Sequence, residues 1–229
     1  MARPPVAFGS ACLTHLNRAP VLPGLPSRPG KIVCVGRNYV DHAKEMGNDV
    51  PKEPLIFLKP SSALIGEGVF IERPPQSKQV EHEGEIGILI GRTLRRASEA
   101  EATQAISGVV AVNDVTARDL QRSDSQWTRA KGFDTFCPVG TIHEGTVDFA
   151  ILEIVTRVNG TVRQRASGRD MVFPVPMLLS FISHIMTLEP GDLVATGTPA
   201  GVGPLVAGDV VEVEIPGVSR VSNPVRDAT

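Results

Sequence analysis

The sequence has few cysteines, few aromatic residues and almost no net charge, and each shortage excludes a class of protein. The three cysteines, Cys12, Cys34 and Cys137, stand far apart in 229 residues, which fits neither a disulfide framework nor a zinc knuckle. Lys and Arg total 23 against 25 Asp and Glu, so there is no basic footprint for nucleic acid or an anionic membrane. Aromatic residues make up 4%, too few for base-stacking platforms.

Long apolar runs are also missing. No stretch approaches the roughly 20 apolar residues of a membrane span, and residues 1–26 lack the apolar core of a signal peptide. We therefore predict a cytoplasmic protein with reduced thiols, and with neither a nucleic-acid nor a membrane partner. Cys137 is a weak candidate nucleophile, because Pro138 follows it and no paired histidine signature lies nearby.

What the chain has in abundance is turn residues. Gly occurs 22 times and Pro 19 times, which favours a β-rich fold with many turns. Short apolar runs between these turns predict strands at 31–35, 54–59, 83–90, 108–113, 193–195 and 210–215, with a hairpin around Asn159-Gly160. Helices are expected at 38–46, 98–106, 116–125 and 176–186, the second with a capping box from Ser98 to Glu101.

The domain organisation follows from the absence of repeats and linkers. Residues 1–30 are Pro-rich and irregular apart from an expected short strand at 6–8, so we interpret them as an N-terminal arm. Residues 31–229 are predicted to form one catalytic domain, which is long enough for a substantial core.

Three acidic residues form the first candidate site. Glu83 and Glu85 lie two apart on a predicted strand, so both carboxylates occupy one face about 7 Å apart along the backbone, while Gly84 leaves the opposite face uncrowded. Asp114 ends the next apolar strand. Neighbouring buried carboxylates need a cation or a proton, and a hard divalent ion with oxygen ligands suits them. A solvated strand face is the alternative, and on that face Glu81 is expected to be an exposed neighbour.

A second candidate site pairs a histidine with a carboxylate. His42 and Glu45 are three residues apart on a predicted helix, which makes them neighbours. A carboxylate against an imidazole fixes its tautomer and raises its basicity, as a general base requires. An exposed pair on an ordinary helix remains the alternative.

Lys131 and a glycine-rich turn complete the candidates. Lys131 precedes Gly132, which allows close backbone approach to a ligand, and a lysine there could stabilise an enolate. The segment 196–203 lacks the Lys-Ser/Thr ending of a phosphate-binding P-loop. We interpret it as a turn whose hydroxyls and amides meet a carboxylate, although a surface lysine and a merely connecting turn are the simpler alternatives.

Taken in order, these segments resemble the fumarylacetoacetate hydrolase superfamily, with residues 31–203 carrying the resemblance. The matching segments are Gly36-Arg-Asn-Tyr39 with Asp41-His42-x-x-Glu45, Phe57-Leu-Lys-Pro60, His82-Glu83-x-Glu85, Asn113-Asp114-x-Thr-Ala-Arg118, Trp127-x-x-Ala-Lys131-Gly-Phe-Asp, Val158-Asn-Gly160 and Thr196-Gly-Thr-Pro-x-Gly-Val-Gly203. Each alone is common, whereas the ordered set is specific. Because the chain is short and lacks the separate N-terminal domain of true fumarylacetoacetases, it looks closer to the single-domain acylpyruvases and their bacterial relatives.

The resemblance implies a fold, a site and a partner. The fold would be the family's mixed β-sandwich roll, usually a homodimer. By position, Glu83, Glu85 and Asp114 match metal ligands for Mg²⁺, Mn²⁺ or Ca²⁺. His42, Glu45 and Lys131 match catalytic positions. The positions matching a substrate pocket are Lys59, Arg118, Gln121 and Thr198.

The expected reaction is metal-dependent C–C bond hydrolysis of an acylpyruvate or fumarylpyruvate-type diketo acid. The metal would polarise the substrate, and the His42–Glu45 pair would activate the attacking water. The same electron sink would serve an oxaloacetate decarboxylase, or an isomerase or decarboxylase of a hydroxymuconate-type diacid in aromatic catabolism. A metabolite-binding module without catalysis is the third hypothesis.

Overall fold

The computed structural model describes residues 28–45, 47, 49–145 and 147–229. The predicted arm, residues 1–30, lies outside this part except for its last three residues, as do Cys12 and the strand expected at 6–8. Strands predominate, which confirms the predicted mixed α/β, β-rich class.

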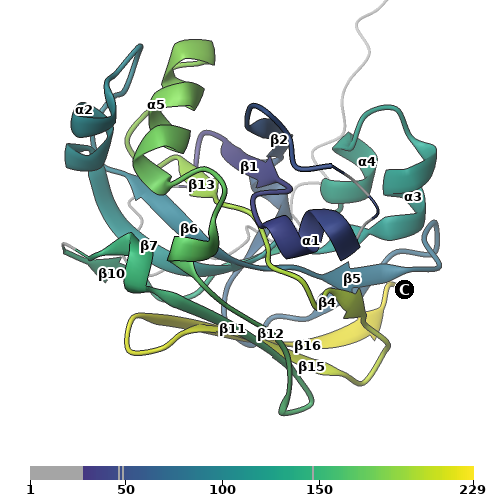
Figure 1. The fold of residues 1–229 in the computed structure, drawn as a ribbon. Helices are drawn as coiled ribbons and strands as arrows, with labels where there is room; N and C mark the ends of the chain where they lie inside the picture. The colour runs from purple at the N-terminus through teal and green to yellow at the C-terminus, as the bar shows by residue number, and fades with distance from the viewer. Residues whose placement is uncertain (1–27, 46, 48, 146) are drawn as a thin grey trace, which may run out of the picture.

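Two large sheets form the framework (Figure 1). The six-stranded sheet has the order β10 (His143–Glu144), β7 (Ile106–Asn113), β6 (Gly84–Ile90), β13 (Leu193–Ala195), β1 (Ile32–Gly36) and β2 (Leu55–Lys59). The five-stranded sheet has the order β12 (Thr161–Ser167), β11 (Glu153–Val158), β15 (Val210–Ile215), β16 (Ser219–Asp227) and β4 (Ile71–Arg73). Most of the pairing is antiparallel, but β1 runs parallel to β13 and β16 runs parallel to β4.

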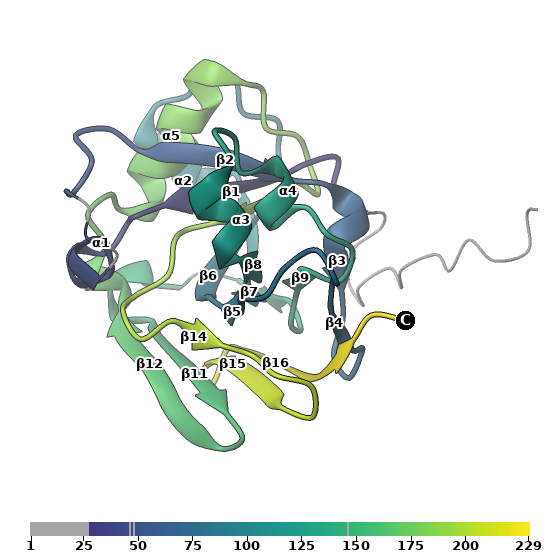
Figure 2. The ribbon, with the colours of Figure 1, turned by 90° about the vertical axis from the view of Figure 1, so that its right-hand side faces the viewer.

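Smaller elements surround the two sheets. They are a three-stranded sheet of β14 (Gly203–Pro204), β5 (Val80–His82) and β8 (Thr116–Ala117), and the pair β3 (Leu64–Ile65) and β9 (Cys137–Pro138). The α-helices are α1 (Val40–Glu45), α2 (Glu99–Gln104), α3 (Arg118–Ser123), α4 (Thr128–Lys131) and α5 (Val175–Ile185). Short 3₁₀ turns occupy Ser61–Ala63, Phe149–Ile151 and Gly168–Asp170. Figures 1 and 2 both place α3 beside α4.

Local sequence signals account for several element ends. The capping box is present, since Ser98 accepts from the Glu101 amide and the Glu101 carboxylate accepts from the Ser98 amide. Asn159 and Gly160 adopt φ of 51° and 77°, the left-handed pair that a two-residue hairpin turn requires. The helix expected at 116–125 is shorter, because Thr116 and Ala117 pair with β5 before α3 begins.

Strand β6 positions the candidate site by simple alternation. Ile86, Ile88 and Ile90 point into the main core, which β15, β16 and α5 also line. Gly84 begins this face, and a Cβ on it would lie 2.0 Å from the Thr156 Oγ1 atom of β11. The opposite face of the same strand therefore carries Glu85, with Glu83 immediately before the strand.

Candidate active site

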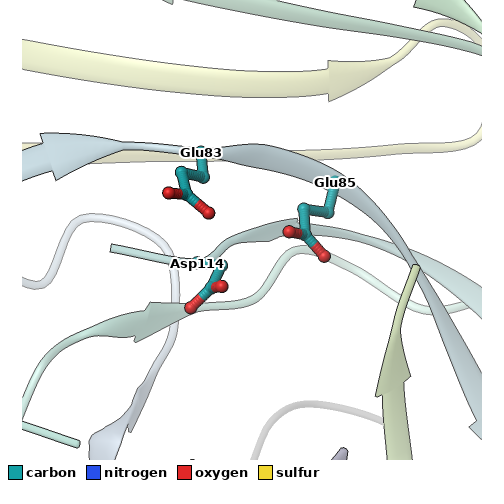
Figure 3. A group of neighbouring side chains, drawn as sticks. All are labelled: Glu83, Glu85 and Asp114. Atoms are coloured by element: carbon teal, nitrogen blue, oxygen red, sulfur yellow. The ribbon is translucent and has the colours of Figure 1, made fainter. Parts of the chain in front are cut away.

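The two glutamates and Asp114 meet at one point. Strand β6 pairs with β7 so that Gly84 lies opposite Asn113 and Glu85 opposite Val112, and the Asp114 amide donates to the Glu83 carbonyl at 2.8 Å. One carboxylate oxygen from each acid lies within 4.8 Å of the others. Figure 3 shows Glu83 and Glu85 side by side with Asp114 facing them. All three are at most 5% exposed, so the solvated strand face is excluded.

Three cations surround these acids. Lys131 Nζ donates to Glu83 Oε2 at 2.9 Å and also to Asp114. Lys59 Nζ donates to the other Asp114 oxygen at 2.6 Å. Arg118 donates to Glu83 and, through Nε, to Glu81 at 2.7 Å. Every acid in the cluster except Glu85 thus contacts a cation.

The surrounding charges shift the pKa values of the two glutamates in opposite directions. Burial raises the pKa of Glu83, but Lys131 and Arg118 outweigh it and hold that pKa below its usual value. Burial raises the pKa of Glu85 well above its usual value, and the negative charges of Asp114 and Glu83 add to the rise. The only hydrogen bond to the Glu85 carboxylate from the described residues comes from the Gly197 amide, at 2.8 Å.

A divalent ion fits this arrangement. Glu85 is buried beside two other carboxylates and lacks a cation of its own, so a dication would neutralise the charge that otherwise favours its protonation. The donors are all carboxylate oxygens, the ligands that Mg²⁺ and Ca²⁺ prefer. The acidic triad could therefore hold a metal ion.

His42 and Glu45 form the expected pair beside this cluster. His42 Nδ1 lies 3.3 Å from Glu45 Oε2, and the Gly201 amide donates to the same carboxylate at 3.1 and 3.2 Å. His42 is 5% exposed, so this is not an ordinary exposed helical pair. Because Nδ1 faces Glu45, Nε2 is the ring nitrogen left to meet a ligand.

One pocket unites most of the predicted residues. Its lining residues come from β1 and the turn after it, α1, β2, β6 and the residue before it, α3, α4 and the residue before it, and the loop after β13. They are Val35, Gly36, Arg37, His42, Phe57, Glu83, Glu85, Arg118, Gln121, Trp127, Lys131 and Thr198. Asp114 and Glu45 stand behind the lining, in contact with Lys131 and His42.

One sequence prediction is wrong, and one predicted residue lies outside the pocket lining. Glu81 was expected to be exposed, and this is wrong: it is 5% exposed because Arg118 holds it inside. Lys59, a predicted substrate-pocket residue, does not line the pocket. It lies behind Asp114, donates also to the Val115 carbonyl at 3.1 Å, and is therefore placed to hold the acid.

Sequence reasoning also missed residues that build the site. Gln164 of β12 is buried, accepts from the Gly84 amide at 3.0 Å, and donates to Thr198 Oγ1 and the Pro199 carbonyl, both at 2.8 Å. It thereby fixes the loop 196–203 against the first residue of β6. The one available signal was a polar residue on the inward face of a hairpin strand.

Thr198, in the same loop, already uses its hydroxyl in hydrogen bonds within the protein. Thr198 Oγ1 donates to the Gly84 carbonyl at 2.9 Å, so this threonine connects the pocket wall to β6.

Both described cysteines, Cys34 and Cys137, are buried free thiols, and burial raises the pKa of Cys137 to about 12. A nucleophilic role for Cys137 is therefore not supported.

Comparison with known proteins supports the fold and identifies the family. Residues 31–226 match the family model described as fumarylacetoacetate (FAA) hydrolase C-terminal. The chain therefore belongs to the fumarylacetoacetate hydrolase family, which confirms the resemblance inferred from its motifs.

Individual relatives are similar over most of their length. Uncharacterized protein MJ1656 of Methanocaldococcus jannaschii is 50% identical over 200 residues, covering 87% of this chain and 84% of the relative. Oxaloacetate tautomerase FAHD1, mitochondrial, of Arabidopsis thaliana is 46% identical (83% and 88% covered), and oxaloacetate decarboxylase, mitochondrial, of Dictyostelium discoideum is 44% identical (82% and 89%).

A solved structure is also similar to this chain in sequence and in fold. The crystal structure of 2-hydroxyhepta-2,4-diene-1,7-dioate isomerase from Mycobacterium marinum is 47% identical, with a TM-score of 0.81 over 89% of this chain and 77% of that one. Within the described part of the chain, no helix is long and apolar enough to cross a membrane.

Proposed function

We propose that this chain is a divalent-metal-dependent enzyme that interconverts the keto and enol forms of a small 2-oxo diacid of the oxaloacetate type. One observation carries the proposal: His42, a candidate base, lines the same pocket as Glu83 and Glu85 of the acidic triad. The proteins it resembles include an oxaloacetate tautomerase, an oxaloacetate decarboxylase and an isomerase of a 1,7-dioate. All three activities pass through an enol or enolate of a 2-oxo acid.

The chain's own residues supply the proton transfer. Glu45 orients the His42 ring through Nδ1, so Nε2 would take the proton from the carbon next to the 2-oxo group and pass it to the enolate oxygen, which gives the enol; the reverse direction moves the proton from oxygen back to carbon. Lys131 would donate a hydrogen bond where negative charge develops on oxygen. Glu83, Glu85 and Asp114 would hold the metal, which when bound supplies Lewis-acid polarisation of the 2-oxo group.

Hydrolysis of an acylpyruvate-type C–C bond is a second candidate, favoured by the same His42–Glu45 pair. Activating a water molecule requires a base in this position, whereas simple decarboxylation uses only the electron sink.

We further propose that residues 31–229 act as one catalytic domain and that the protein is a homodimer. Size-exclusion chromatography with light scattering tests whether the protein is a homodimer.

The deciding experiment compares three activities of one preparation, with Mg²⁺ and with chelator. They are keto–enol conversion of oxaloacetate, release of pyruvate from oxaloacetate, and cleavage of acetylpyruvate. We expect enzymatic keto–enol conversion to be the fastest of the three and to fall to the uncatalysed rate with chelator. Faster acetylpyruvate cleavage would refute the proposal in favour of the hydrolase.

Two variants and a matched control assign the roles. His42→Gln should slow keto–enol conversion by about 10²–10⁴-fold, the usual cost of losing a general base, and Glu83→Gln should abolish it by weakening metal binding. His184→Gln is the control, because this histidine lies exposed on α5 and should not affect any of the three reactions.

A further inference from the structure

A second cavity, of about 530 Å³, lies outside the candidate active site. Its lining residues come from β5, β11, β12, the turn between the last two, and the segment 201–209. They are His82, Val158, Asn159, Val162, Arg163, Gly201, Val202, Gly203, Pro204 and Asp209. None of them lines the candidate active site, and we call this cavity the His82 pocket.

His82 presents a nitrogen without a partner to this pocket. The residue is 1% exposed, and its Nδ1 lies 3.2 Å from Gln164 Oε1. That oxygen accepts from the Gly84 amide, and Gln164 Nε2 donates to the Pro199 carbonyl, so the orientation of the Gln164 amide is fixed and His82 Nδ1 carries the proton. His82 Nε2 remains as an acceptor, and nothing in the described ranges donates to it. A Cβ on Gly203 would lie 3.6 Å from this atom, so the glycine leaves Nε2 open to the pocket.

Two opposite charges line the same pocket without pairing. Arg163 is exposed and makes no hydrogen bond or ion pair with the residues that the structure describes. Asp209 accepts from Asn159 Nδ2 and from the Val206 amide, both at 2.8 Å, but meets no cation in that part of the chain. Because each carboxylate oxygen can accept two hydrogen bonds, Asp209 retains capacity for a ligand.

Apolar side chains form the remaining wall of the pocket. Val158 is buried, Val202 is half-buried, and Val162 is 46% exposed. A ligand that covers Val162 would remove apolar surface from water. The pocket therefore offers a neutral acceptor, an anion, a cation and an apolar wall, which together are complementary to the ammonium group, the carboxylate and the side chain of an aliphatic amino acid.

The His82 pocket is connected to the candidate active site through one loop. Gly201 lines the pocket, and its amide holds the Glu45 carboxylate at 3.1 and 3.2 Å. Gln164 joins His82 to Thr198, which lines the candidate active site. A ligand packed against Gly201 would therefore restrain the loop that positions Glu45 and Thr198.

We infer that the His82 pocket binds an amino acid with an aliphatic side chain, and that this binding raises the activity of the neighbouring site. The ammonium group would donate to His82 Nε2 and to Asp209. The carboxylate would accept from the Arg163 guanidinium, whose planar geometry matches it. Binding to this pocket is independent of the proposed function, whereas the effect on the rate rests on it.

Three related probes test the binding without turnover. They are L-leucine, 4-methylpentanoate, which lacks the ammonium group of leucine, and 3-methylbutylamine, which lacks its carboxylate. Their dissociation constants would be measured by titration calorimetry on the Mg²⁺-loaded protein. Leucine should bind at least about 10-fold more tightly than either of the other two, the effect of a hydrogen bond to a charged group.

Two variants and a control assign the contacts. Arg163→Gln should weaken leucine binding by about 10–100-fold and leave the binding of 3-methylbutylamine unchanged. Gly203→Ala should weaken leucine and 3-methylbutylamine, because its Cβ covers His82 Nε2 at an ordinary contact distance that does not disturb folding. Arg92→Gln removes an exposed arginine outside the pocket and should leave all three affinities unchanged.

The rate of keto–enol conversion tests the connection between the two sites. Saturating leucine should raise kcat/KM for oxaloacetate by about 5-fold, the lower range of coupling between two sites. The same leucine concentration should have little effect on Arg163→Gln and its full effect on Arg92→Gln.

Three results would overturn the binding site: no saturable binding of leucine, equal affinity for all three probes, or wild-type affinity for leucine in both Arg163→Gln and Gly203→Ala. Binding as expected with no change in kcat/KM would overturn the effect on the active site. Failure of the proposed function would look different. In that case the wild type would not convert keto and enol oxaloacetate, while the Arg163-dependent binding of leucine would still be measured.

Discussion

Gly84 lies between the two glutamates of the acidic triad, and its substitution tests how the sandwich shapes the site. A Cβ at this position would lie 2.0 Å from Thr156 Oγ1 and 3.3 Å from both Thr156 Cβ and Val213 Cγ1. Thr156 is fully buried and cannot swing into solvent. Rotation about its Cα–Cβ bond would only exchange the hydroxyl for the methyl group or move either into other core atoms. The strands would have to separate by more than about 1 Å to restore ordinary contact.

We therefore expect Gly84→Ala to lower the free energy of unfolding by about 1–3 kcal/mol, the usual cost of overpacking a core. For a chain of this length each kcal/mol corresponds to about 2–4 °C in melting temperature, so the melting temperature should fall by about 2–12 °C. Because Glu83 and Glu85 flank the displaced residue, Mg²⁺ affinity should fall as well. Thermal melting by circular dichroism and titration calorimetry measure the two effects.

The double variant Gly84→Ala/Thr156→Ala identifies the cause. Removing Oγ1 leaves the new Cβ with contacts near 3.3 Å, so most of the lost stability should return relative to Thr156→Ala alone. Gly203→Ala is the matched control, because the nearest atom to its Cβ would be His82 Nε2 at 3.6 Å. An unchanged melting temperature in Gly84→Ala, or no coupling with Thr156→Ala, would refute the steric explanation.

Three other predictions use single observations from the site and core. Adding Mg²⁺ at about 100 times its Kd should stabilise the protein by about 2.7 kcal/mol, seen as a higher melting temperature. Glu85→Gln should remove this Mg²⁺-induced rise. In the presence of chelator, however, Glu85→Gln should melt at a higher temperature than the wild type, because it deletes a buried carboxylate that lacks a cation. Thr156→Val should stabilise the protein by about 1 kcal/mol, since the Thr156 hydroxyl is buried without a hydrogen-bond partner among the described residues; a denaturant midpoint at or below the wild-type value would contradict this. Cys137 should react with a thiol reagent at pH 8 at least about 10³-fold more slowly than an ordinary cysteine, because its pKa is raised to about 12 and the thiolate is the reacting species; rapid labelling of Cys137, located by mass spectrometry, would show that the core opens there.

The parts of the fold that the sequence predicted well depend on local chemistry. The capping box at Ser98 and the turn at Asn159-Gly160 involve residues a few positions apart. The same is true of Glu83 and Glu85, whose shared face follows from the strand period alone. Joining them to Asp114 required only that two strand ends meet, and β6 and β7 are consecutive strands of one sheet.

The errors and omissions concern contacts between distant segments. Glu81 is buried because of Arg118, 37 positions further along the chain. The role of Gln164 depends on Gly84, 80 positions away. Nothing near Lys59 shows that Asp114, 55 positions later, lies in front of it. Strand alternation predicts which way such side chains point, but only the assembled sheets determine what they meet.

The parallel pairing of β1 with β13 has a consequence for how the protein is made. Strand β13 lies between β1 and β6 in the six-stranded sheet, although its residues follow β1 by about 160 positions. Until Leu193–Ala195 leaves the ribosome, β1 with β2 and β6 with β7 remain separate antiparallel pairs, each exposing an unpaired apolar edge. Such long-range closure is slow, and open edges promote aggregation. A nascent chain stopped before β13 should therefore bind chaperones, and the pocket, whose walls come from both halves of this sheet, should form only at the last step of folding.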